Sequence, residues 1–324
     1  MKKILIIFLS IITLFASTNS TVIAIETSME SESIMAEPAD DYRHSGSYKK
    51  DAITGEVTFI PSEPLNQLSN EISGYSPGYN PSGDYILPEI SPFVIFGKDN
   101  RVPITNPNLY GQYRNTVYIE TTNAKGETHR GTGFMVGPNT VATNGHIVYN
   151  PSNGGDNWVT SAKIVPARKP GTDWAPYDTA KAIAYECGGN WADYQDANDD
   201  WGIIRLDKNI GDKTGWLGLY WQSGSYNGTK VMLNGYPKEV EGKDTWTMYR
   251  SDGTITISEA RMLKSNDLDA SGGNSGGPCY IWDDSYGYTA IGILQGGIGE
   301  SYTTILRIDQ WIYNKLVSFR TSRA

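Results

Sequence analysis

The feature that most narrows the choice of fold is a glycine-rich stretch around a single serine, at residues 271–279. Ser275 is preceded by glycines at positions 272 and 273 and followed by two more glycines and Pro278. Glycine allows tight turns that a Cβ atom would forbid, so main-chain N–H groups can point at one spot beside the hydroxyl. Acyl transfer needs a nucleophile next to such donors. By itself, a Gly-x-Ser-x-Gly match more often marks an ordinary loop, so the remaining sequence has to distinguish the two.

The order of the histidines relative to this serine excludes one large fold class. A serine nucleophile needs a base, usually histidine, and a carboxylate that orients the base. The chain contains three histidines, His44, His129 and His146, and all of them precede Ser275. An α/β-hydrolase places its histidine after the serine. The sequence therefore excludes that fold and disfavours a lipase or esterase.

His146 is the candidate base. It follows the alternating segment 140–143, and the small residues before it allow the chain to turn sharply. His44 lies in the N-terminal segment, outside the expected globular body. His129 lies at a hairpin end near residues 127–130, where a solvated side chain is the default expectation.

Two adjacent aspartates are the candidates for the orienting carboxylate. Asp199 and Asp200 directly precede an expected buried strand at residues 201–206. An aspartate at the start of such a strand can accept the imidazole N–H while backbone donors hold its charge. Because Asp200 abuts the strand, we assign it this role and expect Asp199 to be solvated. An Asp-Asp pair standing alone would indicate only a loop end.

The first 24 residues are typical of a secretory signal. Lys2 and Lys3 precede an apolar run at residues 4–16, and small residues at 22–24 provide a cleavage site. That run is too short for a comfortable membrane span, and no later stretch is long enough. We therefore expect a secreted, extracellular protein without stable membrane association.

Residues 25–93 differ in composition from the body of the chain, residues 94–324. This segment carries 12 acidic and three basic residues, whereas the whole chain has a net charge of −9, so the body is nearly neutral. It lacks helical periodicity, and residues 75–84 have the composition of a linker. A propeptide is the favoured interpretation, and a disordered spacer is the alternative. The weak charge of the body gives no indication of a nucleic-acid partner.

From residue 94 onward the chain consists of short alternating strands separated by turns. Residues 246–250 and 254–258 flank Ser-Asp-Gly at 251–253, which indicates a hairpin. Only the C-terminus has helical periodicity, with one apolar face (Ile308, Trp311, Ile312, Leu316, Phe319). The pattern predicts an all-β fold of two packed antiparallel six-stranded barrels, at residues 94–208 and 209–324, with a C-terminal helix.

The two cysteines, Cys187 and Cys279, cannot form the framework of a chain this long. In an exported protein an even number permits a disulfide, and two buried free thiols are the other possibility. No cysteine and histidine cluster has zinc-ligand spacing. We expect that neither a metal nor an organic cofactor is required, and structural Ca²⁺ among the acidic loops stays an open alternative, although no EF-hand spacing is present.

Three motifs in fixed order resemble the chymotrypsin-like serine endopeptidases, and most closely the secreted glutamyl endopeptidases of Gram-positive bacteria. These motifs are Thr143-Asn-Gly-His146, Asp200-Trp-Gly-Ile-Ile and Gly273-Asn-Ser-Gly-Gly-Pro278. Further segments of the chain are similar to segments of that family (94–101, 131–138, 233–237, 256–259). The resemblance covers residues 94–324, essentially the whole body.

The resemblance implies a role for each matched residue. His146 acts as general base and then acid, Asp200 fixes its tautomer, and Ser275 attacks the scissile carbonyl. The N–H groups of Gly273 and Ser275 form the oxyanion hole. Residues 292–297, which include Gln295 and Gly296, correspond to the strand that pairs with the substrate main chain and walls the specificity pocket. The resemblance also implies a zymogen that another protease cuts between Glu89 and Val94.

The specificity pocket departs from the family pattern. Relatives bind the substrate carboxylate with a histidine where this chain has Leu294, assisted by a hydroxyl residue where it has Ala270. A glutamate carboxylate buried without such partners loses several kcal/mol. Asp269 lies at the floor position of a trypsin-like pocket, where it favours Arg or Lys; if it points away, the pocket suits medium-sized apolar residues. We therefore expect a non-acidic preference.

The competing function is a non-catalytic relative, such as a toxin-like or binding module that keeps the barrels and loses turnover. The filled triad positions and Gly273 favour the enzyme, whose partners would be polypeptide substrates and an activating protease.

Overall fold

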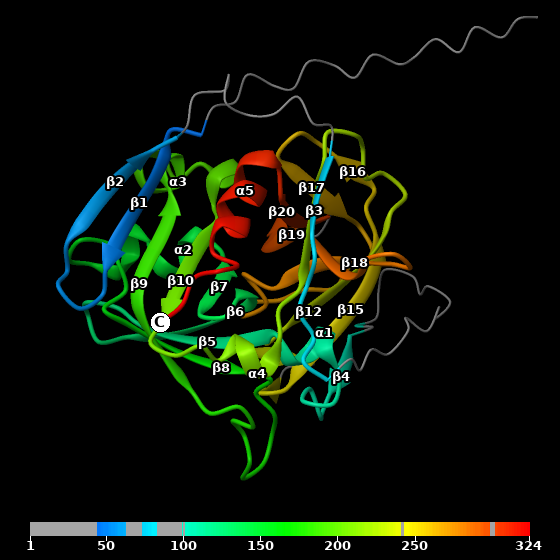
Figure 1. Ribbon diagram of the computed structural model, residues 1–324, viewed down its shortest axis with the longest axis horizontal. Coiled ribbons are helices and arrows are strands. Elements are labelled where there is room, and N and C mark those ends of the chain that lie inside the picture. Colours follow the sequence, from blue (N-terminus) through cyan, green and yellow to red (C-terminus); the bar gives the residue numbers. More distant parts are fainter. Residues whose placement is uncertain (1–43, 63–72, 83–98, 100, 241–242, 299–301) are drawn as a thin grey trace, which may run out of the picture. The chain divides into compact units, whose positions relative to one another are not determined.

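The computed structural model describes residues 44–62, 73–82, 99, 101–240, 243–298 and 302–324 (Figure 1). The expected signal at residues 1–24 and the expected cut between Glu89 and Val94 lie outside the described residues. In the described part, no helix has the length and apolar character needed to cross a membrane.

Six antiparallel strands form a closed barrel in the first half of the body. Its hydrogen-bonded order is β10-β7-β6-β5-β8-β9, and β9 also pairs with β10, which closes the ring. Alternate residues of these Val-, Ile- and Thr-rich strands point inward, as in β5, where Val117 and Ile119 are fully buried. The strands are β5 (Thr116–Thr122), β6 (Thr128–Gly137), β7 (Thr140–Thr143), β8 (Ser161–Pro166), β9 (Ala180–Gly188) and β10 (Gly202–Leu206).

The second half of the body, together with β4 from the start of the body, forms another sheet, whose strands follow the order β16-β17-β20-β19-β18-β12-β15-β4. Strand β11 (Gly218–Gln222) pairs with β19 in parallel. A separate ribbon consists of β13 (Glu239–Val240) and β14 (Lys243–Asp244). The strands of the main path are β4 (Val102–Ile104), β12 (Lys230–Gly235), β15 (Met248–Thr254), β16 (Ile257–Ser258), β17 (Met262–Ser265), β18 (Pro278–Asp283), β19 (Gly287–Ile298) and β20 (Tyr302–Arg307).

The prediction of a hairpin turn at residues 251–253 is wrong. Strand β15 runs straight through these residues and pairs with β12 from Tyr249 to Thr254. Gly253 has a packing role there, because a Cβ atom on it would lie 2.6 Å from Asp267 Oδ1 and 2.7 Å from Leu268 Cγ. Glycine is therefore needed at position 253 because the segment containing Asp267 and Leu268 packs closely against it, and not because the chain turns there.

Three strands come from the segment that precedes the body. Strand β1 (Gly46–Asp51) pairs with β9 and with β2 (Val57–Pro61), and β3 (Ser73–Ser76) pairs with β11. Figure 1 shows β1 and β2, in blue, next to β9. The prediction of a linker at residues 75–84 is therefore wrong for residues 75 and 76, because these residues belong to β3 and pair with β11.

The longest described helix is the expected C-terminal one, α5 (Gln310–Ser318). Asp309 caps it by accepting a hydrogen bond from the N–H of Ile312 at 2.8 Å. Its predicted apolar face is confirmed, since Ile308, Ile312 and Leu316 are at most 1% exposed. The other described α-helices are short: α1 (Gly111–Arg114), α2 (Gly145–Val148), α3 (Gly189–Tyr194) and α4 (Gly211–Thr214), with 3₁₀ turns at Pro151–Asn153 and Ala197–Asp199.

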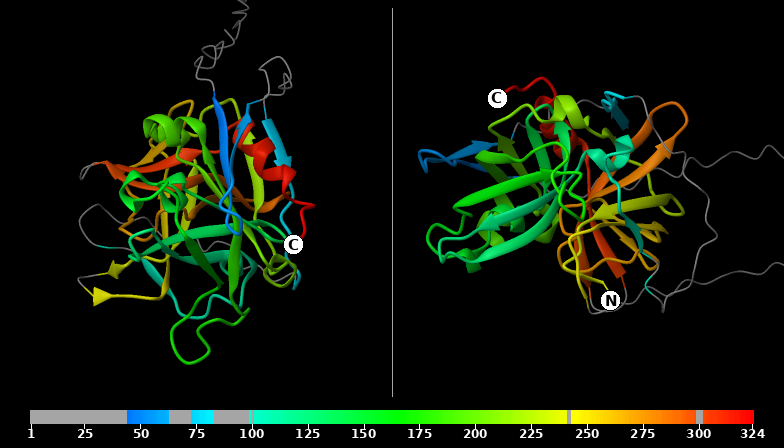
Figure 2. Two further views of the ribbon diagram at one scale, coloured as in Figure 1. Left: turned by 90° about the vertical axis from the view of Figure 1, so that its left-hand side faces the viewer. Right: turned by 90° about the horizontal axis from the view of Figure 1, so that it is seen from below.

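One core cluster joins the two sheets. Phe134 and Trp201 from the barrel pack with Tyr280 and Leu306 from the second sheet and with Ile312 of α5. The two sheets, drawn in green and in yellow to orange, lie side by side in Figure 1 and in the right-hand view of Figure 2. The predicted all-β fold with a C-terminal helix is confirmed.

Cys187 and Cys279 are both free and fully buried, in different core clusters. The sequence left open a disulfide or two buried free thiols, and the structure has the two buried free thiols.

Candidate active site

The register of two barrel strands brings His146 next to Asp200. Thr143, at the end of β7, lies opposite Gly202, at the start of β10. The residues that follow one strand and precede the other are therefore neighbours in space. The His146 N–H donates to Asp200 Oδ1 at 2.8 Å, and the ring Nδ1 lies 2.8 Å from Asp200 Oδ2. The side chain of Asn144 adds a hydrogen bond to the Asp200 carbonyl at 3.0 Å.

This contact controls the charge of the imidazole. The Asp200 side chain is only 5% exposed, whereas that of His146 is 25% exposed. Burial alone would lower the pKa of His146, but the charge and the hydrogen bond of Asp200 outweigh it and raise that pKa. Because Asp200 accepts the Nδ1 proton, Nε2 is the nitrogen left to act on a substrate or a nucleophile.

The loop that carries Ser275 can be built only with glycine at two positions. Gly273 and Gly276 have φ angles of 99° and 88°, in the left-handed region that other residues avoid. A Cβ atom on Gly276 would lie 2.0 Å from the carbonyl oxygen of Thr132, and one on Gly273 would lie 2.5 Å from that of Tyr236. The sequence signal for a tight turn at this serine is therefore confirmed.

Thr132, on barrel strand β6, ties this loop to the barrel. Its N–H donates to the Ser275 carbonyl at 2.9 Å, and its hydroxyl donates to the Gly273 carbonyl at 2.7 Å. The same hydroxyl accepts the Tyr236 N–H at 2.9 Å, and the Thr132 carbonyl accepts the hydroxyl of Thr143 at 2.8 Å. One fully buried threonine thus sets the position of the serine loop relative to the strand that leads to His146.

Gln295 connects the serine with the aspartate. The Ser275 hydroxyl donates to the Gln295 carbonyl at 3.0 Å, and within the described part of the chain it makes no hydrogen bond to His146. The Gln295 side chain donates to the carbonyl of Ala197 and, at 3.4 Å, to Asp200 Oδ2. In unliganded sites, such contacts commonly tighten only when substrate binds.

Two main-chain donors lie beside the serine. The N–H groups of Gly273 and Ser275 donate to no other residue among those the structure describes. An N–H group without an acceptor in the protein can donate a hydrogen bond to the oxygen of a bound acyl group.

The residues expected to shape the specificity pocket gather around one core cluster. Leu294 is fully buried in it, and Ala270 packs against it. Asp269 is partly buried, and its N–H donates to the Ser251 hydroxyl at 2.9 Å. A register shift between Leu294 and Gly296 interrupts the ladder at Gln295, and the Gly296 carbonyl accepts the Thr304 hydroxyl at 2.9 Å.

Two residues near the site differ from the sequence prediction. Asp199, expected to be solvated, is completely buried and accepts hydrogen bonds from the Trp201 indole and the Asn190 N–H, both at 2.9 Å. His44, set aside as part of the leader, is buried with its ring Nδ1 2.7 Å from Asp199. No local sequence signal identifies these contacts, because their partners lie far apart in the chain. His129 is 49% exposed, as predicted.

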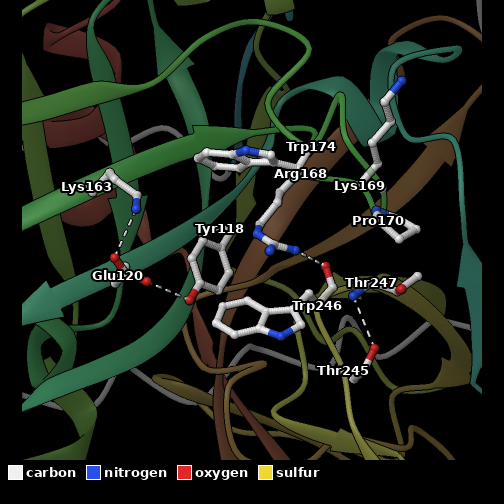
Figure 3. A pocket seen from close by; sticks show the side chains of 11 residues that line it. Tyr118, Glu120, Lys163, Arg168, Lys169, Pro170, Trp174, Thr245, Trp246 and Thr247 are labelled. Carbon is white, nitrogen blue, oxygen red and sulfur yellow. Dashed lines mark hydrogen bonds and ion pairs between the residues drawn. The ribbon is translucent and has the colours of Figure 1, made fainter.

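A separate cavity of about 550 Å³ lies over β5 and β8 (Figure 3). The guanidinium group of Arg168, which lines the cavity, lies 4.5 Å from the centre of the Trp246 ring and 5.1 Å from the centre of the Tyr118 ring. The Arg168 carbonyl accepts the Tyr236 hydroxyl at 3.2 Å, which connects the cavity wall to the residue beside the serine loop. None of the site residues predicted from the sequence lines this cavity.

Comparisons with known proteins agree with this geometry. Residues 106–312 match the family described as Trypsin. The chain is 32% identical over 234 residues to a glutamyl endopeptidase of Bacillus licheniformis, which covers 70% of this chain and 69% of that protein. It is 31% identical over 229 residues to an extracellular metalloprotease of Bacillus subtilis, covering 70% of each.

A solved structure, that of a Glu endopeptidase in complex with MPD, shares the fold. It has a TM-score of 0.58 and 21% identity, and the match covers 70% of this chain and 98% of that one. The chain belongs to the trypsin family of chymotrypsin-like serine endopeptidases, within the group that includes the glutamyl endopeptidases. It is a serine endopeptidase, and its substrates are polypeptides. The described residues contain no group of three or more His, Cys, Asp or Glu side chains that could hold a metal.

Thr132→Val should destabilise the protein, because it removes the hydroxyl that joins the barrel to the serine loop. The buried Gly273 carbonyl and Tyr236 N–H lose their partner, at about 1–3 kcal/mol for each unsatisfied group. Thermal melting should therefore occur several degrees lower than in the unaltered protein. Thr132→Ser keeps the hydroxyl and is the matched control. Equal melting temperatures for the Val and Ser variants would contradict this role.

Proposed function

We propose that this protein is a secreted endopeptidase, made as a zymogen, that hydrolyses peptide bonds through Ser275, His146 and Asp200. The observation that carries the proposal is the double hydrogen bond from His146 to Asp200, with the serine loop fixed beside it by Thr132. This arrangement supplies a base of defined orientation and a nucleophile on a rigid turn.

In the proposed reaction, the Ser275 hydroxyl turns from the Gln295 carbonyl to His146 Nε2 and attacks the scissile carbonyl. His146 takes the proton and then gives it to the leaving amine, while Asp200 stabilises the imidazolium. The developing oxyanion accepts hydrogen bonds from the N–H groups of Gly273 and Ser275, and each of these bonds contributes about 3 kcal/mol of transition-state stabilisation. Water then hydrolyses the acyl-enzyme by the same steps.

Secretion and activation are supported by the leader sequence. A signal at residues 1–24 would be removed during export, and an activating protease would cut between Glu89 and Val94, where the resemblance to the family begins. The new N-terminus would then complete the specificity pocket.

The substrate preference is proposed from two apolar side chains. Leu294 and Ala270 stand where the family places the imidazole and the hydroxyl that bind a glutamate carboxylate, and both pack against the core cluster. Apolar groups offer that carboxylate no hydrogen bond. We therefore propose that the residue before the scissile bond is non-acidic in good substrates.

Ser275→Ala, His146→Ala and Asp200→Asn should each lower kcat at least about 10,000-fold, because the three residues act as one unit. The fold should persist, as judged by circular dichroism. A fluorophosphonate should label Ser275 in the cut protein but not in Ser275→Ala. His129→Ala, at an exposed histidine, is the control and should keep full activity. An intact cut protein that is not labelled would favour the non-catalytic alternative.

The pH profile should reflect the contact between His146 and Asp200. His146 accepts a proton only when neutral, and Asp200 raises its pKa, so kcat/KM should rise with pH to a half-maximal point above about 6.5, the ordinary value for histidine. In Asp200→Asn this point should move to lower pH. The profile should be the same with and without a metal chelator. An unchanged midpoint in Asp200→Asn would contradict the proposed role of the aspartate.

Matched peptides that differ only in the residue before the scissile bond test the substrate preference. We expect kcat/KM for the Arg, Leu or Phe peptide to exceed that for the Glu peptide. Leu294→His should raise the value for the Glu peptide selectively. If the glutamate peptide is cut about a hundredfold faster than the others, the preference is acidic. The candidate receptor would then be Arg101, which donates to the Ser271 hydroxyl at 2.7 Å.

A further inference from the structure

The predicted propeptide contributes strands to the barrel of the enzyme. Strand β8 pairs with β9 only at Ala180 and Lys181, so the rest of that edge of β9 is open. Strand β1 fills it with a continuous ladder from Ser47, opposite Gly188, to Asp51, opposite Ala184. An open strand edge exposes unpaired N–H and C=O groups, and β1 satisfies them.

Next to this ladder, His44 enters a buried cluster of charged groups. Its Nδ1 lies 2.7 Å from Asp199, and its Nε2 lies 3.1 Å from Asp309, the cap of α5. Arg261 contacts both His44 and Asp309. The imidazole stacks on Trp311 with ring centres 4.3 Å apart and planes inclined at 18°. His44 therefore contacts the turn before β10, the turn before β17 and the start of α5.

A second buried contact lies beside the first. The Ser47 hydroxyl donates to Glu186 at 2.5 Å, and Lys315 of α5 pairs with the same carboxylate. Glu186 is only 4% exposed, so its charge needs these partners. Without residues 44–62, the carboxylates of Asp199 and Glu186 would each lose a hydrogen-bond partner.

His44 also balances the charge of its cluster. Asp199 and Asp309 together with Arg261 carry one net negative charge, which a protonated His44 neutralises. Removing one partner from a buried ionic group is strongly destabilising, because the remaining charge is left uncompensated. Retaining residues 44–62 avoids that loss.

We propose that residues 44–62 stay bound to the body after the activating cut, and that His44 is a positioning residue for the turn that carries Asp200. The inference rests on the proposed function, since it concerns the product of the cut between Glu89 and Val94. In the active protein, residues 44–62 would then be a non-covalently bound second chain.

The turn at residues 197–200 is held from two sides. His44 binds Asp199, and Arg261 donates to the Asn198 carbonyl at 2.9 Å. From the other side, Gln295 donates to the Ala197 carbonyl and to Asp200. Losing the contacts on the His44 side would let the turn move and misorient the Asp200 carboxylate. The chemical step should then slow, while substrate binding should change little.

Retention should depend on pH. Burial would lower the pKa of His44, but hydrogen bonds to Asp199 and Asp309 and the charge of Asp309 raise it despite the opposing charge of Arg261. A raised pKa stabilises the bound state fully below the ordinary value of about 6.5, and this contribution is lost as pH rises through the raised value. Between those two values, the dissociation constant should increase about tenfold for each pH unit.

The experiment uses the full chain after the cut. Native size exclusion and mass spectrometry at pH 6 should find a fragment containing residues 44–62 eluting with the body, and raising the pH should release it. His44→Ala should weaken retention and lower kcat roughly 10- to 100-fold with KM within about twofold. His44→Gln keeps a hydrogen-bonding side chain without a titrating proton, so its dissociation constant should be nearly independent of pH. Lys49→Ala, at an exposed residue of β1, is the matched control.

Each outcome decides one of the two hypotheses. A body that elutes at pH 6 without the fragment and has full kcat overturns this inference and leaves the proposed function intact. The inference also fails if His44→Ala matches Lys49→Ala in retention and kcat. If the unaltered cut protein neither labels with the fluorophosphonate nor hydrolyses peptides in any form, the proposed function itself is wrong.

Discussion

The hydrogen bonds of Thr132 hold the two halves of the body in the register that the site requires. The serine loop belongs to the second sheet, whereas His146 and Asp200 belong to the barrel, so no local structure positions one relative to the other. Thr132 bridges them with its N–H and its hydroxyl, which bond the carbonyls of Ser275 and Gly273. The Thr132 carbonyl accepts a hydrogen bond from the hydroxyl of Thr143, which lies three residues before His146. Because the residue is fully buried, these bonds are shielded from water and specify one arrangement.

Two adjacent carboxylates face opposite sides of one turn. Asp200 binds the imidazole of His146, and Asp199 binds the imidazole of His44. Both are buried, and a buried carboxylate stays ionised only where donors or cations surround it. Burial would raise the pKa of Asp309, the other carboxylate at His44, but Arg261 and His44 lower it to about 2. The turn thus couples the candidate site to the segment before the body through electrostatics.

The barrel also explains how a short segment without its own core can be ordered. Residues 46–51 gain their hydrogen bonds from the edge of β9, and Figure 1 shows them lying along it. Ser47, at the start of this ladder, donates a hydrogen bond to the buried carboxylate of Glu186, and Lys49 is exposed to solvent. The segment is stabilised by the body and not by its own apolar content.

The sequence by itself determined the fold class, the apolar face of the terminal helix and the candidates His146, Asp200 and Ser275. Each carries a short-range signal: strand alternation, helical periodicity, or glycines whose backbone angles other residues avoid. It could not determine the partners of His44 and Asp199, or that residues 251–253 continue a strand. The ring of His44 meets groups 155 and 265 residues away, and Gly253 is required by a neighbour 14 residues on. Such contacts arise only when distant segments pack together, because burial and pairing depend on where the whole chain places each group.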